Sequence, residues 1–197
     1  MSVVGDTLSR RDIAQLARAH VEALPDSLVS LVGERFARTF YAYASASADE
    51  LVLTERDGAA LIGACLVSLA PETLSRRLLQ RTSLSLHAAL AVHRLPLRAM
   101  LASATGPKAP PQPPGPEILL IFTLPEVRSR GVGARLLARC EELLAARGIP
   151  RLFVKTRDDA ANRALQFYAR AEFLRIATRT KYGKRLALFE KPLRGTS

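Results

Sequence analysis

The stretch from Glu117 to Arg147 constrains the fold more than any other part of the chain. It begins with an apolar segment, EILLIFTL, continues through an arginine- and glycine-rich loop, RSRGVG, and ends in apolar residues spaced along one helix face. An unbroken apolar segment is typical of a strand that is buried on both faces. Because another short strand, RLFVKT, follows at residues 151–156, the sequence predicts a βαβ crossover at the centre of the fold.

The flanking segments complete a mixed α/β pattern around this crossover. The other elements that we expect are helices at 9–24, 27–43 and 159–171, a hairpin of strands at 49–55 and 59–69, and strands at 174–180 and 185–193. The order is α-α-β-β, an insertion, and then β-α-β-α-β-β. It predicts a single α/β domain over residues 1–197, with a mixed sheet and an N-terminal helix pair.

Residues 71–116 interrupt this pattern between the hairpin and the central strand. Residues 72–104 read as two basic, leucine-rich helical pieces divided at Pro96. Residues 106–116, GPKAPPQPPGP, contain too much proline for a helix or a central strand, so we expect a stiff connector there. The insertion is therefore predicted to be helical and proline-rich, with apolar stripes that need a surface to cover.

The composition indicates a cytoplasmic protein with an anionic ligand. The formal net charge is +11, and the basic residues are scattered without a run of five or more, which favours a small anion over nucleic acid. No segment approaches the roughly 20 apolar residues of a membrane span, and the N-terminus lacks the pattern of a secretory signal. Cys65 and Cys140 lie in apolar patterns and are expected to be buried free thiols.

The loop before the central helix contains the residue types of an anion-binding site. Gly131 and Gly133 let an anion approach the backbone, the helix N-terminus carries partial positive charge, and Arg128 and Arg130 add full charges. The loop is not a dinucleotide-binding fingerprint, because Leu136 stands in place of the third glycine. It is not a P-loop either, because no Gly-Lys-Ser/Thr sequence is present.

Together with the segment that follows, this loop resembles one protein family. RSRGVG after EILLIFTLPEV is similar to the Arg/Gln-x-x-Gly-x-Gly/Ala signature of the GNAT N-acetyltransferase superfamily, and NRALQFYARAEF resembles the next block of that family. The resemblance is specific over residues 117–192, looser over 8–70 and absent from the insertion. It implies a GNAT-like domain that uses acetyl-CoA as cosubstrate and needs no metal.

The resemblance also implies roles for individual residues. The pyrophosphate of acetyl-CoA is expected on the loop and first helical turn, which comprise Arg128, Ser129, Arg130, Gly131, Val132, Gly133 and Ala134. Glu117 resembles the general base of the family, and Tyr168 resembles its general acid. Backbone N–H groups near Phe122 and Thr123 are expected to meet the acetyl carbonyl where the strand bulges. Glu117 and Tyr168 also have a structural interpretation, as a strand start and a packed aromatic ring.

Two positions depart from the family pattern. An asparagine often lies seven residues before the tyrosine, but Ala161 stands there; Asn162 is the remaining candidate for its cofactor contact, rotated toward another helix face. The usual Gly-Phe turn is Glu172-Phe173 here. Because glutamate tolerates a left-handed backbone poorly, we expect that turn to have a different shape.

The sequence favours a small-molecule N-acetyltransferase whose acceptor is a primary amine, either an amino sugar or an amino-acid-like compound. The insertion would cap the acceptor pocket, and Arg76 and Arg77 would attract an anionic group on the acceptor. His20 is expected to be a core histidine. A protein or peptide N-acetyltransferase is the first alternative, and a basic module without enzyme activity that binds a membrane surface or nucleic acid is the second. No nucleic-acid partner is expected, and the family pattern is consistent with a homodimer.

Overall fold

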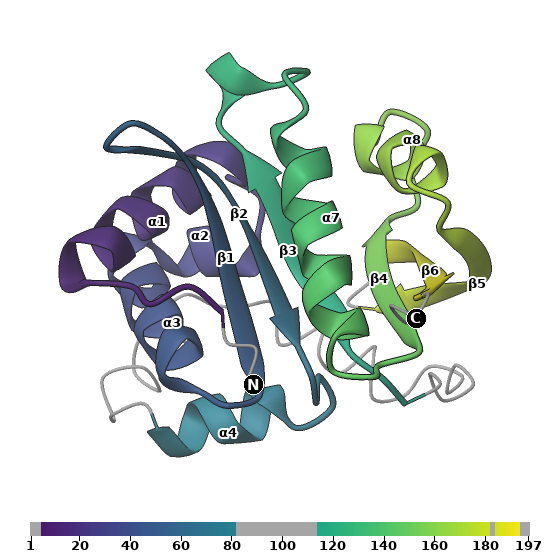
Figure 1. The fold of residues 1–197 in the computed structure, drawn as a ribbon, viewed down its shortest axis with the longest axis horizontal. Coiled ribbons are helices and arrows are strands. Elements are labelled where there is room, and N and C mark those ends of the chain that lie inside the picture. Colours follow the sequence, from purple (N-terminus) through teal and green to yellow (C-terminus); the bar gives the residue numbers. More distant parts are fainter. Residues whose placement is uncertain (1–4, 82–113, 182–183, 194–197) are drawn as a thin grey trace.

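A computed structural model gives the fold and describes residues 5–81, 114–181 and 184–193. Six strands form one sheet in the order β1-β2-β3-β4-β6-β5 (Figure 1). The strands are β1 (Glu50–Asp57), β2 (Ala60–Ser68), β3 (Glu117–Thr123), β4 (Arg151–Arg157), β5 (Leu174–Lys181) and β6 (Lys184–Pro192). The helices are α1 (Arg10–Ala23), α2 (Leu28–Val32), α3 (Glu34–Ala46), α4 (Leu74–Arg81), the short 3-10 helix η1 (Pro125–Val127), α7 (Val132–Ala145) and α8 (Arg163–Arg170).

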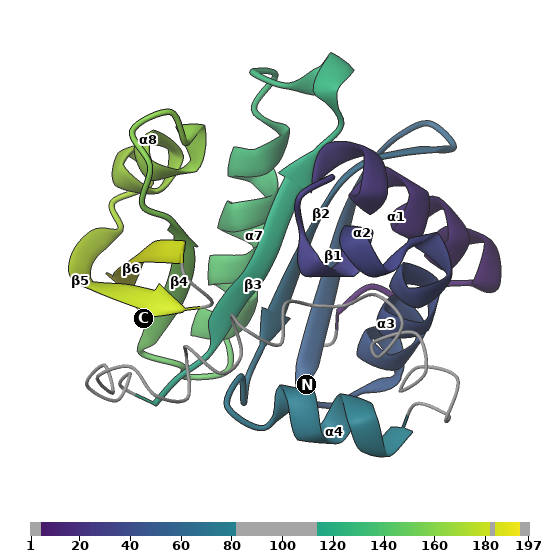
Figure 2. The same ribbon diagram turned by 180° about the vertical axis from the view of Figure 1, so that it is seen from behind.

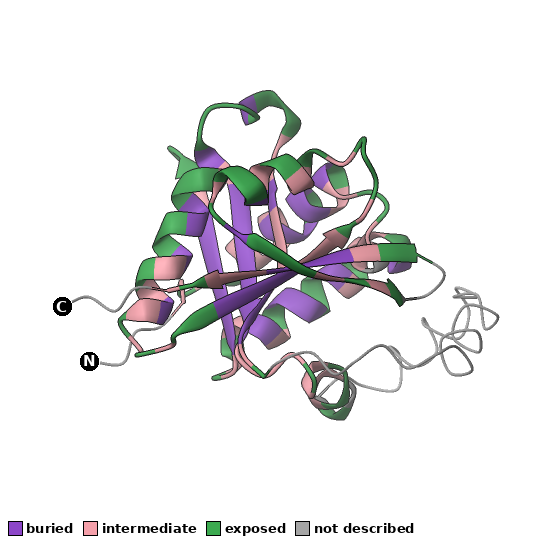
Figure 3. Cartoon of the chain, turned by 90° about the vertical axis from the view of Figure 1, so that its right-hand side faces the viewer, coloured by how far each residue is buried: buried purple, intermediate pink, exposed green. Residues whose placement is uncertain are grey.

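The central crossover is confirmed. Strands β3 and β4 are parallel and are joined through α7, whereas the other neighbouring strands pair in antiparallel fashion. Helix α7 packs on one face of the sheet, and α1 and α3 pack on the other (Figures 1 and 2). The two apolar clusters therefore lie on opposite faces, and Figure 3 shows buried residues on the central strands and on the inner sides of these helices. None of the described helices is long and apolar enough to cross a membrane.

The N-terminal helices differ from the prediction in one respect. The single helix expected at 27–43 is broken at Gly33, whose φ of 110° ends α2 and starts α3. A β-carbon disfavours that backbone conformation, so glycine permits the break. The predicted start of α1 is confirmed, because Ser9 and Asp12 form a reciprocal capping box.

His20 is a core histidine, as the sequence predicts. Its side chain is fully buried, Nδ1 lies 2.6 Å from the Tyr41 hydroxyl, and Nε2 lies 2.7 Å from the Ser27 hydroxyl. Burial lowers the pKa of His20 to about 4, so the ring is neutral at physiological pH. Since Ser27 also caps α2, this chain of hydrogen bonds joins α1, α2 and α3.

The two cysteines are buried and free, which confirms that prediction. Cys65 on β2 and Cys140 on α7 belong to the same apolar cluster. A hydrogen bond with Cys140, together with burial, raises the pKa of the Cys65 thiol well above its ordinary value. Both thiols therefore act as small apolar side chains where α7 packs on the sheet.

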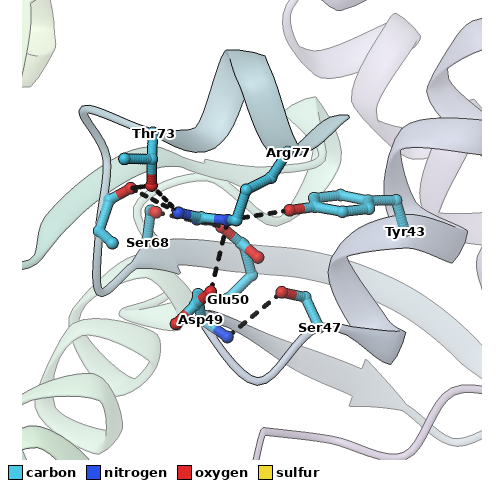
Figure 4. Close-up of polar contacts among 8 residues, drawn as sticks. Tyr43, Ser47, Asp49, Glu50, Ser68, Thr73 and Arg77 are labelled. Carbon is cyan, nitrogen blue, oxygen red and sulfur yellow. Dashed lines mark hydrogen bonds and ion pairs between the residues drawn. The ribbon is translucent and has the colours of Figure 1, made fainter. Parts of the chain in front are cut away.

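The described part of the insertion is fixed at one end of the sheet. Figure 1 shows α4 at the end opposite to the loop that precedes α7. Arg77 of α4 donates to the Glu50 carboxylate, to the Thr73 hydroxyl, to the Tyr43 hydroxyl at 3.2 Å and to the Ala70 carbonyl at 3.1 Å (Figure 4). The prediction that Arg77 attracts an anionic acceptor is therefore wrong, because buried Glu50 already neutralises its charge. Residues 82–113, which include the proline-rich connector, lie outside the described residues.

We expect Arg77→Met to lower the free energy of unfolding by about 3 kcal/mol, because it leaves the Glu50 carboxylate buried without its cation. Urea unfolding followed by circular dichroism measures the change. The matched control is Arg76→Met, which replaces the exposed neighbour and should change the stability by less than about 0.5 kcal/mol. An Arg77→Met protein as stable as this control would show that the Glu50 pair contributes nothing.

Candidate functional site

The sheet opens into a groove between β3 and β4. Their parallel pairing is limited to Glu117 with Phe153 and Ile118 with Val154, and the strands diverge beyond these pairs (Figures 1 and 2). The opening forms a groove of about 790 Å³. Its walls come from β3, β4, the loop before α7, the first turn of α7, α8 and the C-terminal end of α1. The fold therefore brings the predicted glycine loop and the predicted tyrosine to one site.

A bulge in β3 lies at Leu119. Opposite β2, Leu66 pairs with Leu120 and Val67 pairs with Ile118, so Leu119 is the extra residue. The consecutive residues Leu119 and Leu120 consequently pack toward the cluster of α1 and α3, although strand residues normally alternate between faces. A bulge is present, as the resemblance implies, but it lies before Phe122 and Thr123.

The register of β3 decides which backbone groups face the groove. Leu124 donates to the Ile62 carbonyl on the β2 side, at 2.9 Å. In an antiparallel ladder every second residue points the same way, so the N–H of Phe122 also faces β2. The N–H groups of Ile121 and Thr123 face away from β2, toward the groove. Phe122 and Thr123 both line the groove, but the register turns the N–H of Thr123 toward it, together with that of Ile121, and the N–H of Phe122 away from it. Contact of these groups with an acetyl carbonyl stays a prediction.

The loop before α7 has the form of an anion-binding site. Gly131 caps α7 with φ 75°, and Ser129 also has a positive φ, of 65°, which is strained for a residue with a side chain. Within the described part of the chain, the backbone N–H groups at residues 131–134 have no hydrogen-bond partner. These four donors lie at the positive end of a helix dipole and border the groove.

The predicted loop residues line the groove with one exception. Arg130 does not border it, and its carbonyl accepts a hydrogen bond from the Arg135 side chain at 3.2 Å. Arg128 does border it and also donates to the Ala23 carbonyl, at 3.4 Å, at the C-terminal end of α1. Arg128 thus bridges the glycine loop and the N-terminal helices across the groove.

Tyr168 lies on α8 and lines the groove. Its ring is buried against Phe167, Phe173 and Phe189, so packing alone would justify an aromatic residue there. Its hydroxyl makes no hydrogen bond to any described residue, and burial raises the pKa of Tyr168 far above its ordinary value. The phenol is therefore protonated at neutral pH, and its role as a proton donor stays a prediction.

Glu117 does not line the groove. It is 7% exposed at the start of β3, and its Oε2 lies 2.7 Å from the Lys155 ammonium on β4. The pair stands beside the fork where the two strands part. The catalytic role of Glu117 stays a prediction, because a proton would have to reach it from the groove through a water.

Asn162 and Glu172 mark the two ends of α8. Asn162 lines the groove, but its side chain caps α8 by accepting from Ala164 N–H and donates to Thr156 and to the Arg157 carbonyl. Its described contacts are therefore structural.

Glu172 adopts a left-handed backbone with φ 63°, so the prediction of a different turn shape is wrong. The Phe173 N–H bonds to the Tyr168 carbonyl at 3.0 Å, which gives the usual helix-ending motif with glutamate in the glycine position.

Several groove residues were not predicted. On α8, the groove is lined by Arg163, Gln166, Phe167 and Arg170. Their spacing of three and four residues is that of one helix face, so the sequence held a signal for them. Lys155 carried no such signal, because it borders the groove only through the divergence of β3 and β4. Among the described residues, no group of histidine, cysteine or acidic side chains is arranged to hold a metal.

Comparison with known proteins identifies the family. The family model for "Acetyltransferase (GNAT) family" matches residues 17–173, which include the groove and both of its walls. The chain belongs to the GNAT acetyltransferase family. Members of this family use acetyl-CoA, so the anion that the loop of this GNAT protein is built to hold is expected to be the pyrophosphate of that molecule. Comparison with curated proteins gives no significant match.

Solved structures show the same fold. The PaiA N-acetyltransferase from Thermoplasma acidophilum in complex with coenzyme A has a TM-score of 0.60 and 14% identity, with 95% of this chain and 96% of that chain covered. The ribosomal-protein-S18-alanine N-acetyltransferase from Escherichia coli has a TM-score of 0.60 and 14% identity, covering 98% and 94%. The aminoglycoside 6'-acetyltransferase type Ii has a TM-score of 0.61 and 13% identity, covering 98% and 98%. At these identities the similarity shows the fold of this GNAT protein and leaves its acceptor open.

We expect Gly133→Ala to weaken acetyl-CoA binding about tenfold or more without harming the fold. A β-carbon on Gly133 would lie 3.5 Å from the Phe167 ring, an ordinary contact, and alanine is the better helix former. The same β-carbon would stand where a phosphate oxygen approaches the first turn of α7. Isothermal titration calorimetry measures the affinity, and urea unfolding controls for stability. An alanine variant that binds as tightly as the wild type would contradict this position for the pyrophosphate.

Proposed function

We propose that this protein transfers an acetyl group from acetyl-CoA to the primary amine of a small molecule. One observation carries the proposal: the unpaired N–H groups at the start of α7, the outward N–H groups of β3 and the free Tyr168 hydroxyl border one groove. Each of these groups suits one part of acetyl-CoA. The first would hold the pyrophosphate, the second the carbonyl oxygen, and the third the sulfur.

The reaction makes three demands on the protein. The amine must lose a proton, the developing negative charge on the carbonyl oxygen must be stabilised, and the departing thiolate must gain a proton. Acetyl-CoA supplies the activated thioester. We assign charge stabilisation to the N–H groups of Ile121 and Thr123, protonation of the thiolate to Tyr168, and removal of the amine proton to Glu117 through a water. Asn162 orients α8, and with it Tyr168, by capping the helix.

A peptide amine is the second candidate acceptor. The groove is open to solvent, and one structural neighbour is named for its action on an alanine of a ribosomal protein. We prefer a small-molecule acceptor because the described lining of the groove is compact, at about 790 Å³, and combines apolar residues of β3 with cationic side chains. A cytoplasmic location is part of the proposal and is supported by the two free thiols. A homodimer stays a prediction.

Acetyl-CoA should bind to the protein and stabilise it. At a concentration about a hundredfold above the dissociation constant, linkage adds roughly 2.7 kcal/mol to the free energy of unfolding. Thermal unfolding with and without the ligand measures the shift, and a thiol-release assay against a panel of primary amines then identifies the acceptor. The absence of both a shift and a calorimetric signal with millimolar acetyl-CoA would contradict the proposed function.

Tyr168→Phe should lower turnover about 10²-fold or more while acetyl-CoA affinity stays within threefold, because only the proton donor is lost. Stability should hardly change, since the hydroxyl bonds to no described residue. The matched control is Tyr43→Phe, whose hydroxyl accepts from Arg77 at the far end of the sheet and whose loss should leave turnover unchanged. Equal turnover of the Tyr168 variant and this control would show that Tyr168 only packs.

A further inference from the structure

Lys155 stands where the groove begins. It is the first residue of β4 beyond the last pair with β3, which joins Ile118 to Val154. Val154 packs into the cluster that contains α7, so strand alternation directs Lys155 to the opposite face. That face is the one covered by α1 and α3. Lys155 therefore points away from the α7 face, on which the phosphate-binding turn begins.

The Lys155 ammonium has N–H donors that bond to no described residue. An ammonium group has three N–H donors, and among the described residues Lys155 uses one, on Glu117. Its side chain is 26% exposed and borders the groove, whereas the Glu117 side chain is 9% exposed and does not. The pair consequently presents its positive end to a ligand, with the carboxylate directly behind it.

Every charged side chain in the described lining of the groove is cationic. Its described lining includes four cationic residues and no aspartate or glutamate; the cations are Arg128, Lys155, Arg163 and Arg170. Arg128 belongs to the phosphate loop, and Arg163 and Arg170 belong to α8, so Lys155 alone of the four comes from the sheet. A polycationic amine would meet like charges here, whereas an acceptor with an anionic group would be attracted. The adjoining wall of β3 on the face of α1 and α3 is apolar and contains Leu119 and Leu120.

We propose that Lys155 binds the carboxylate of the acceptor, and that the acceptor is an α-amino acid with an apolar side chain. Because Glu117 lies 2.7 Å from Lys155, a carboxylate held on the ammonium brings the adjacent amino group close to the assigned base. The apolar wall of β3 receives the side chain. This inference rests on the proposed function and makes Lys155 a residue that determines specificity.

The test compares two acceptors of the same shape, one with a carboxylate and one with a neutral amide in its place. L-Leucine and L-leucinamide are assayed by thiol release from acetyl-CoA with the wild type and with Lys155→Gln. We expect the substitution to lower kcat/KM for L-leucine about tenfold or more, as for the loss of a charged hydrogen bond, and for L-leucinamide less than threefold. Comparing each acceptor with itself across variants cancels the difference between the two amines in basicity.

Two further variants make the comparison specific. Lys191→Gln removes a similar, partly buried lysine that bonds to Glu141 at 2.7 Å outside the groove, and it should affect neither acceptor. Lys155→Arg keeps a cation at the fork and should retain L-leucine activity within about tenfold of the wild type. Urea unfolding verifies that each variant is folded.

The alternatives give different outcomes. Equal losses for L-leucine and L-leucinamide would overturn the inference, because they would mean that Lys155 only positions Glu117. Turnover of spermidine in preference to both leucine compounds would overturn it too, while leaving the acetyltransferase assignment in place. If acetyl-CoA binds but L-leucine and other apolar amino acids release no thiol, the inference fails alone. If acetyl-CoA does not bind, the proposed function fails with it.

Discussion

The early divergence of β3 and β4 is the constraint on which the site depends. Parallel strands normally satisfy each other's backbone groups along their length, yet these two pair at only two positions. The inner edge of β3 is thereby left with N–H groups that no neighbouring strand takes up. Buried backbone groups need partners, so the groove is a place where a ligand completes the hydrogen bonding of the sheet.

The groups around the fork divide between the two faces of the sheet. On the α7 face lie the unpaired donors of the first helical turn and Tyr168, whose raised pKa keeps its proton in place. On the opposite face lie the Lys155–Glu117 pair and the helices that His20 ties together. Arg128 connects the faces by reaching from the glycine loop to the end of α1. A donor molecule on one face and an amine on the other would meet only at the opening.

The parts of this arrangement that follow from local pattern could be predicted from the sequence. An apolar strand, two glycines among arginines and an amphipathic helix predicted the crossover and the loop that borders the groove, and the family resemblance of the Phe-Tyr segment pointed to Tyr168. The break at Gly33 was missed because a glycine inside an apolar pattern does not reveal its φ. The bulge at Leu119 was invisible in an unbroken apolar run, since shifting the alternation there changes no residue type. Arg77 looked available because the sequence could not show that Glu50 lies buried beside it.

The most direct test of the account is backbone hydrogen exchange with and without acetyl-CoA, resolved to single amides. If the pyrophosphate lies at the start of α7 and the thioester at the fork, the amides of Gly131, Val132, Gly133 and Ala134 should become protected, together with those of Ile121 and Thr123. The amides around Arg77, at the other end of the sheet, should exchange as before. If acetyl-CoA leaves the exchange rates of the amides in the first turn of α7 unchanged, the account is contradicted.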